Sequence, residues 1–163
     1  MSTAIDPTQF RAALARFASG ITVLTMRDAA GTDLGMTATA FTSLSLDPPL
    51  VLVCIDAKAT MATPLTTGVA FAVHVLREDQ EHLSRRFAAT TGDRFAGLTL
   101  ERSAAGTPLL PDVLMRMECE VVARHPGGDH HIIVARPEQV RLAAIGDPLL
   151  YFRGRYGRLA QTP

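Results

Sequence analysis

The stretch GMTATAFTSLSLDPPLVLVCID, residues 35–56, sets the fold class of this chain. Residues 34–40 predict one short strand, and apolar residues alternate with polar ones over residues 41–46, as in a strand with one buried face. The two prolines at 48 and 49 end that run, because proline cannot donate to a central ladder. Residues 50–55 are continuously apolar, which predicts a strand buried on both faces.

Working outward, the chain adds more strands and few helices. Asp6 and Pro7 are typical of a helix start, and we expect that helix to end at Ser19–Gly20. Further strands are expected over residues 21–26, 69–76, 113–124, 131–144 and 149–159, short helices over residues 59–67 and 78–87, and irregular structure over residues 88–112. Turns join most strands, so we expect a mostly β protein with peripheral helices outside a closed antiparallel barrel.

Length and composition narrow the function classes. A chain of 163 residues that is 47% hydrophobic suits one domain, residues 1–163. Sixteen basic and 16 acidic residues give a net charge of zero, which argues against a general nucleic-acid binder. No apolar run approaches the roughly 18 residues of a membrane span, and the N-terminus lacks the pattern of a signal peptide. We interpret Cys54 and Cys119 as reduced, buried thiols and expect a cytoplasmic protein.

Small and hydroxylated residues are dense at Thr37, Ala38, Thr39 and Ala40. Small side chains let a flat ligand approach the backbone closely, and threonine hydroxyls then bond a polar edge or a phosphate. A threonine-rich edge strand explains the same residues without a ligand.

Lys58 is the only lysine in the chain, and it follows the expected strand 50–55 directly. A lysine at the start of the expected helix, beside the hydroxyl of Thr60, suits phosphate binding. The competing interpretation is a solvated lysine on a loop.

Two further segments carry chemistry-bearing side chains. The glycines of GGDHH, residues 127–131, indicate a tight turn that presents one imidazole to a pocket. Adjacent histidines on a strand point to opposite faces, so His130 and His131 do not easily share a metal ion, and we expect no metal site. Aromatic residues and arginines alternate in PLLYFRGRY, residues 148–156, as in a stacking surface or a strand with one wet face.

In this order, these segments resemble the short-chain flavin reductases, the NAD(P)H:flavin oxidoreductase partners of two-component flavin-dependent monooxygenases. The resemblance runs from about Phe10 to Tyr156. It is carried by residues 10–25, by GMTATAFTSLSLDPPL at 35–50, by Gly-Asp-His at 128–130 and by residues 148–156.

The resemblance implies a split β-barrel of the FMN-binding type, a homodimer with flavin near the subunit interface, and hydride transfer from NADH or NADPH to FMN or FAD. Reduced flavin would then diffuse to a monooxygenase. The implied cofactor-binding residues are Thr37, Ala38, Thr39 and Ala40 along the isoalloxazine and ribityl chain, Cys54 on the adjoining wall, Asp56, Lys58 and Thr60 at the phosphate, and Phe87 and Ala88 near the phosphate or adenylate end. His130 is implied beside the nicotinamide, with Tyr156 at the same mouth.

Ala40 departs from the family pattern, because many relatives have serine there. The lost hydroxyl contact leaves the choice between FMN and FAD open. Three alternatives also remain at this stage: a split-barrel oxidase of the pyridoxamine-phosphate-oxidase type, a non-catalytic flavin-binding protein, and a structural barrel without a ligand. The absence of a Ser/His/Asp motif or a phosphate-binding loop motif suits chemistry performed by a flavin.

Overall fold

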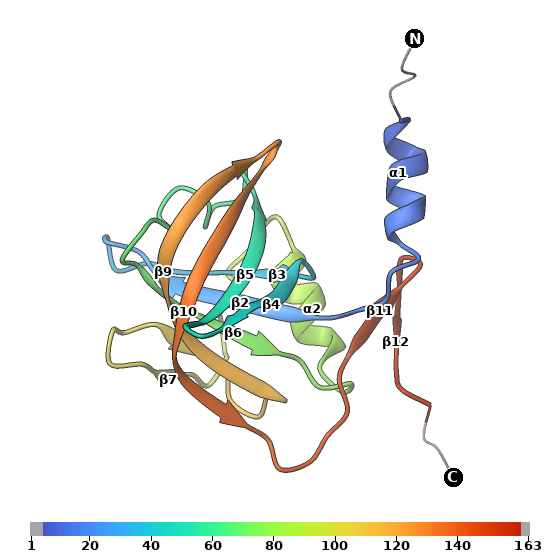
Figure 1. Ribbon diagram of the computed structural model, residues 1–163. Helices are drawn as coiled ribbons and strands as arrows, with labels where there is room; N and C mark the ends of the chain where they lie inside the picture. Colours follow the sequence, from blue (N-terminus) through green and yellow to red (C-terminus); the bar gives the residue numbers. More distant parts are fainter. Residues whose placement is uncertain (1–4, 161–163) are drawn as a thin grey trace.

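Strands dominate the computed structural model, which describes residues 5–160 (Figure 1). Two eight-residue helices accompany them. The elements are α1 (Pro7–Leu14), β1 (Ser19–Gly20), β2 (Thr22–Arg27), β3 (Asp33–Ala38), β4 (Phe41–Leu46), β5 (Pro49–Asp56), β6 (Ala70–Val75), α2 (Glu81–Ala88), β7 (Glu101–Arg102), β8 (Pro108–Leu109), β9 (Met115–Gly127), β10 (His130–Leu142), β11 (Leu150–Phe152) and β12 (Arg155–Gly157). The predicted mostly β character is confirmed.

The main sheet has seven antiparallel strands in the order β3-β2-β6-β9-β10-β5-β4. Its two edge strands, β3 and β4, are joined by Thr39 and Ala40 alone, so the sheet must curl until its edges meet. Within residues 5–160 those edges do not pair, and the predicted closed barrel is therefore wrong in this respect. The backbone of Thr39 and Ala40 lies outside the regular ladder. The carbonyl of Ala40 accepts a hydrogen bond from the amide of Cys54 at 3.0 Å.

Apolar side chains fill two clusters, one on each face of β2. Leu24 and Met26 belong to the larger cluster inside the curled sheet, with Phe71 and Ile133. Val23, the neighbour of Leu24, belongs to the second cluster, which includes the side chains of Leu83 and Phe87 from α2. This division follows from the alternation of side chains along a strand. It places α2 against the outside of the sheet, beside β3.

Helix α1 begins as predicted but ends early. The carboxylate of Asp6 caps it by accepting a hydrogen bond from the amide of Gln9 at 3.0 Å. The helix ends at Leu14 because Ser19 and Gly20 form β1, which pairs with β11. All residues of α1 are exposed, and the helix stands with β11 and β12 away from the curled sheet (Figure 1).

The helix predicted over residues 59–67 is wrong. This segment consists of turns that bury Met61, Ala62 and Leu65 in the main core. The spacing of these apolar residues resembles a helix face, but Pro64 has no N–H to donate and crowds the preceding turn. Lys58 therefore lies in a turn and not at a helix N-terminus.

Two strand predictions also need correction. Strand β5 is not buried on both faces, since Val51, Val53 and Ile55 are buried while Leu52 and Cys54 are half-buried. The strand predicted over residues 149–159 is a hairpin, β11–β12, whose turn holds Arg153 and Gly154 at positive φ. Positive φ at both central residues gives the turn a twist that matches that of the paired strands.

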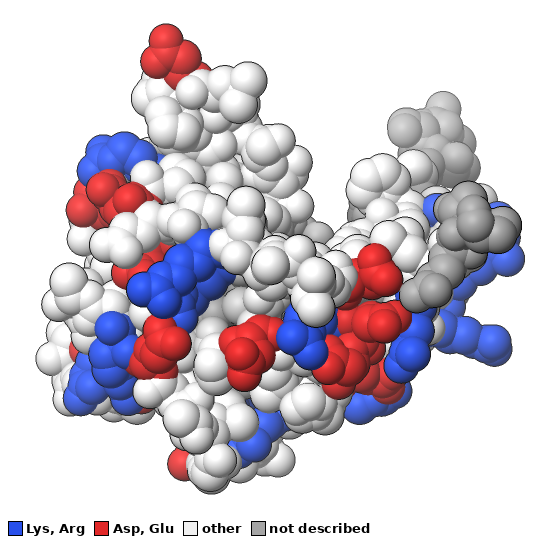
Figure 2. Space-filling model, turned by 90° about the horizontal axis from the view of Figure 1, so that it is seen from below, with Lys and Arg blue, Asp and Glu red and all other residues white. Residues whose placement is uncertain are grey.

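Charged side chains of both signs are interspersed on the face shown in Figure 2. No helix within residues 5–160 is both long and apolar enough to cross a membrane.

Both cysteines are free, with Cys119 buried and Cys54 half-buried, so the prediction that both are buried holds for Cys119 alone. Burial raises the pKa of the Cys119 thiol to about 12, which keeps it protonated at neutral pH.

Candidate functional site

An apolar cavity of about 420 Å³ lies where the two edges of the sheet meet. It is bounded by the end of α1, the 39–42 segment and the half-buried face of β5. All nine lining residues are uncharged: Leu14, Phe17, Ser19, Thr39, Ala40, Phe41, Thr42, Leu52 and Cys54. Apolar walls with a few hydroxyl and backbone groups are typical of sites for flat organic ligands. Of the sequence-predicted residues, the structure brings Thr39, Ala40 and Cys54 together here.

Thr37 and Ala38 do not line this first cavity. The Thr37 hydroxyl donates to the carbonyl of Ser84 at 2.7 Å, which ties β3 to α2. The side chain of Ala38 is buried in the main core, and its carbonyl accepts from the Thr22 hydroxyl at 2.7 Å. Because side chains alternate along β3, neighbouring residues of this motif serve different surfaces.

A second cavity, of about 200 Å³, adjoins the first, because Thr39 lines both. Its lining is Ile21, Thr37, Thr39, Ser84, Ala88, Tyr151 and Tyr156. The Tyr156 hydroxyl lies 3.0 Å from the Ser84 hydroxyl, and the guanidinium of Arg85 lies 4.8 Å above the Tyr156 ring. The resemblance implies Ala88 near the phosphate or adenylate end and Tyr156 at the nicotinamide mouth beside His130. The structure instead places Ala88 and Tyr156 together in this cavity, whose lining does not include His130.

Sequence reasoning missed Ser84, Arg85 and Tyr151 at this second cavity. Ser84 and Ala88 share one face of α2 at i, i+4 spacing. This spacing would have predicted Ser84 at the cavity, because Ala88 was already a candidate residue. Tyr151 lies directly opposite Tyr156 in the β11–β12 hairpin, and their rings meet edge to face with centroids 5.5 Å apart. Only the hairpin makes them neighbours.

Phe87 and Ala88 are consecutive residues of α2, so their side chains point to different sides of the helix. Its ring is 1% exposed, and it packs edge to face on Phe95 with centroids 5.1 Å apart. A Cβ added to Gly35 would lie 2.6 Å from the Phe87 ring, so glycine is required for the contact of β3 with α2. The structure thus places Phe87 in the second apolar cluster and Ala88 at the cavity.

A polar group forms where β5 ends beside the β9–β10 turn. Asp56 is opposite His130 in the ladder, and the Ala57 amide donates to the carbonyl of Asp129 at 3.0 Å. This docking brings Lys58 close to Asp129. The predicted phosphate and nicotinamide residues Asp56, Lys58 and His130 therefore lie together at one end of the sheet, and all reach solvent.

Hydrogen bonds fix the geometry of this polar group. The His130 Nδ1 lies 2.7 Å from a carboxylate oxygen of Asp129, and the Asp56 carboxylate accepts from the Lys58 amide at 2.8 Å. The hydrogen bond to His130 is the main cause that lowers the pKa of Asp129, and the nearby charge of Lys58 adds to this effect. Asp129 thus stays ionised at neutral pH, and it orients the imidazole.

Thr60 faces a different cavity, of about 260 Å³, between the turn after β5 and the loop 90–95. Arg94 lines it too, and its guanidinium donates to the carbonyls of Gly35 and Ala89. Arg94 was missed because nothing local distinguishes it from the other arginines of an irregular segment. Within residues 5–160 no group of three or more His, Cys, Asp or Glu side chains is arranged to hold a metal ion.

The model of the flavin reductase like domain matches residues 14–160, a span that contains all these cavities. The chain belongs to this family. It is 43% identical over 150 residues to the reductase component of 4-hydroxyphenylacetate 3-monooxygenase from Thermus thermophilus, covering 92% of this chain and 95% of that protein. It is also 41% identical to an NADH-dependent flavin reductase from Rhodococcus, with coverage of 95% and 88%.

Among solved structures, this chain resembles the NADH:FAD oxidoreductase of Streptomyces globisporus in complex with NAD and FAD fragments. The TM-score is 0.89 at 34% identity, and the match covers 98% of each chain. The expected split-barrel fold is confirmed by this likeness and by the curled, unclosed sheet.

Proposed function

We propose that this protein is an NAD(P)H:flavin oxidoreductase that transfers hydride from NAD(P)H to FMN or FAD and supplies reduced flavin to a partner monooxygenase. The observation that carries this proposal is the uncharged cavity at the meeting sheet edges, which has no carboxylate, imidazole or amine among its nine lining residues. When bound, a flavin accepts hydride from a nicotinamide through its own ring system. The protein therefore needs to position the two rings and does not need to transfer a proton.

The residues of the cavity fit an isoalloxazine ring. Thr39 and Ala40 lie outside the regular ladder, and although the Ala40 carbonyl is bonded to the Cys54 amide, the Ala40 N–H is offered to the polar edge of a ring. Phe17, Phe41 and Leu52 supply apolar surface that excludes water. At Ala40 a backbone N–H takes the place of the serine hydroxyl of many relatives. Lys58 and Thr60 are the proposed phosphate ligands, and His130, oriented by Asp129, positions the nicotinamide.

The direct test is the oxidation of NADH and NADPH by purified protein, followed at 340 nm with and without FMN, FAD or riboflavin. We expect rapid oxidation that requires added flavin or retained flavin. Flavin binding without NAD(P)H oxidation contradicts the proposal and favours the oxidase or flavin-binding alternatives.

Lys58 provides a selective prediction. Lys58→Ala is expected to weaken binding of FMN and FAD about tenfold, because a charge-assisted contact to phosphate is lost. Binding of riboflavin, which lacks phosphate, should change less than about twofold. Fluorescence titration of the three flavins measures this, with Lys58→Arg as the variant that keeps the charge. Equal losses for all three flavins exclude Lys58 from the phosphate site.

His130 and His131 form a matched pair on opposite faces of β10. We expect His130→Ala to raise the KM for NADH about five- to tenfold while flavin affinity changes less than about twofold, since the imidazole contacts the nicotinamide side of the site. His131→Ala, on the other face, should leave both nearly unchanged. Steady-state kinetics measures the KM for NADH, and flavin titration measures the flavin affinity. An unchanged KM for NADH with lost flavin binding assigns His130 to the flavin instead.

A homodimer is part of the proposal. Phe10, Leu14 and Phe17 on and after α1 are 52%, 57% and 81% exposed, and a second copy of the chain would cover them. We expect light scattering after size exclusion to give two copies of the 17.5 kDa chain. Phe10→Glu should shift the protein toward monomer, whereas Val140→Glu, at a half-exposed position on β10, should not. A monomeric wild-type protein contradicts this prediction.

We further propose that residues 1–163 form one domain, which the span of the family model supports. Free thiols at both cysteines support the expected cytoplasmic location.

A further inference from the structure

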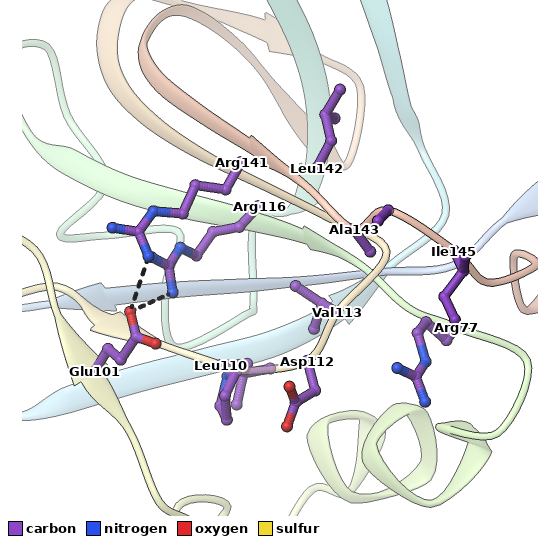
Figure 3. A pocket seen from close by; sticks show the side chains of 12 residues that line it. Arg77, Glu101, Leu110, Asp112, Val113, Arg116, Arg141, Leu142, Ala143 and Ile145 are labelled. Carbon is purple, nitrogen blue, oxygen red and sulfur yellow. Dashed lines mark hydrogen bonds and ion pairs between the residues drawn. The ribbon is translucent and has the colours of Figure 1, made fainter.

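A cavity of about 270 Å³ lies at the opposite end of β10 from the proposed nicotinamide residue (Figure 3). A strand rises about 3.3 Å per residue, so Arg141 is roughly 35 Å along the strand from His130. The cavity is formed by the end of β10, the start of β9 and the segment before β9. Its volume suits a small molecule rather than a dinucleotide. The proposed hydride transfer uses none of its lining residues.

Two arginines face each other across the ladder at this cavity. Arg116 on β9 is directly opposite Arg141 on β10 in the register of the hairpin. Their side chains run side by side toward Glu101, as Figure 3 shows. Like charges directly opposite on paired strands are destabilising. Both guanidinium groups approach the same oxygen of Glu101, at 2.9 Å from Arg116 and 3.7 Å from Arg141. The single negative charge of Glu101 is therefore shared by two positively charged side chains.

Arg116 is also incompletely hydrogen-bonded. Its side chain is 7% exposed, and its Nε is buried without a hydrogen-bond partner among residues 5–160. Leaving a buried donor of a charged group unpaired is costly, and such groups are rare in folded proteins. Arg141, by contrast, is 71% exposed and is free to reorient toward an incoming anion. The pair thus places two positive charges against one carboxylate, and both side chains line the cavity.

The rest of the cavity has a different character. Leu110 and Val113 form a buried apolar floor, and Ile145 stands at the rim. At the far end, the guanidinium of Arg77 is engaged by both oxygens of Asp79, at 3.1 and 2.7 Å. The carboxylate of Asp112 lines that end too and would repel an anion there. The available positive charge is therefore at the Arg116–Arg141 end, with apolar surface between the two ends.

We propose that this cavity binds a small organic monocarboxylate with an apolar body. The carboxylate pairs with Arg116 and Arg141 and relieves their mutual repulsion, while the body packs against Leu110, Val113 and Ile145. Charge-assisted bonds from two guanidinium groups fix the orientation of the ligand. This site is independent of flavin and nicotinamide binding.

The test is titration calorimetry of the full-length protein with phenylacetate as the probe, and with phenylacetamide and inorganic phosphate as comparisons. Phenylacetamide has the same shape without the charge, and phosphate has charge without the apolar body. We expect phenylacetate to bind at least tenfold more tightly than either. Arg141→Gln, at an exposed position, should weaken phenylacetate binding at least tenfold. NADH oxidation should be unchanged in that variant.

Glu101→Gln gives a result of opposite sign. It removes the carboxylate that competes for the two arginines, so phenylacetate should bind several-fold more tightly. A merely structural role of the Arg116–Glu101–Arg141 contacts does not predict this gain. Absence of binding, equal binding by wild type and Arg141→Gln, or binding of phosphate as tight as that of phenylacetate each overturns the proposal, whatever the outcome of the NADH oxidation assay.

Discussion

Replacing Phe87 by alanine is expected to lower the free energy of unfolding by about 3–5 kcal/mol, the usual cost of deleting a fully buried aromatic ring. The ring is 1% exposed and packs between Gly35 and Phe95, where little can move to fill the space. Urea unfolding followed by circular dichroism measures the loss. Phe152→Ala, at a side chain that is 41% exposed, is the matched control and should change stability by about 0.5 kcal/mol or less.

This expectation separates two roles for Phe87. The family resemblance implies contact with the phosphate or adenylate end of the flavin, whereas its burial implies support of the α2–β3 contact behind the cavity. Phe87→Leu keeps most of the apolar volume, so under the packing role it should retain flavin affinity within about twofold. A Phe87→Ala protein that is as stable as wild type, but binds flavin poorly, contradicts the packing role.

The difference between residues that face the cavity and residues that pack behind it explains how far the sequence predicts the site. The sequence predicts strands over residues 34–40 and 41–46, and the structure has β3 and β4 there. Thr39 and Ala40, which the prediction placed in the first strand, form the link between the two strands. Alternation also means that half of such a motif faces away from the ligand. Ala38 in the core and Thr39 at the cavity illustrate this. Which half faces the cavity depends on the curl of the sheet, a long-range property that no local pattern records.

The remaining site residues depend on tertiary contacts. Lys58 approaches Asp129 because the amide of Ala57 bonds to the β9–β10 turn, and not because a helix begins there. Arg94 reaches Gly35 across 59 positions of sequence. Ser84 becomes a partner of Tyr156 only when the terminal hairpin folds back onto α2. Each of these contacts joins segments whose own composition is ordinary, which is why sequence reasoning placed some of them poorly and missed others.

Acid should destabilise the fold through His74. The imidazole is fully buried on β6, with its Nδ1 3.0 Å from the carbonyl of Val23 and its Nε2 accepting from the amide of Leu110 at 3.1 Å. An accepting Nε2 requires the neutral ring with its proton on Nδ1. Protonation of Nε2 would place two donors against each other. Burial is the main cause that lowers the pKa of His74 to about 4, and the nearby charge of Arg116 adds to it.

The sign of the pH effect follows from this lowered pKa. The unfolded chain binds the proton near pH 6.5, while the folded protein resists it down to about pH 4, so the stabilisation is complete above about 6.5 and is lost as the pH falls toward 4. The loss should be on the order of 3 kcal/mol, at about 1.4 kcal/mol for each whole number in pKa. The lowered pKa of Asp79 and that of Asp129 act at more acidic pH, below their ordinary value of 3.8.

Urea unfolding at pH 7.5, 6.0 and 4.5 tests the prediction, with His74→Gln as the control. The glutamine side chain does not titrate, and its oxygen is available to accept from the Leu110 amide. We expect the variant to be less stable than wild type at pH 7.5, and its free energy of unfolding to change little between pH 6.0 and 4.5. If the variant loses stability with acid as steeply as the wild type does, another group is responsible. The buried His74 link between β2, β6 and the segment before β9 then has no part in the acid sensitivity of the fold.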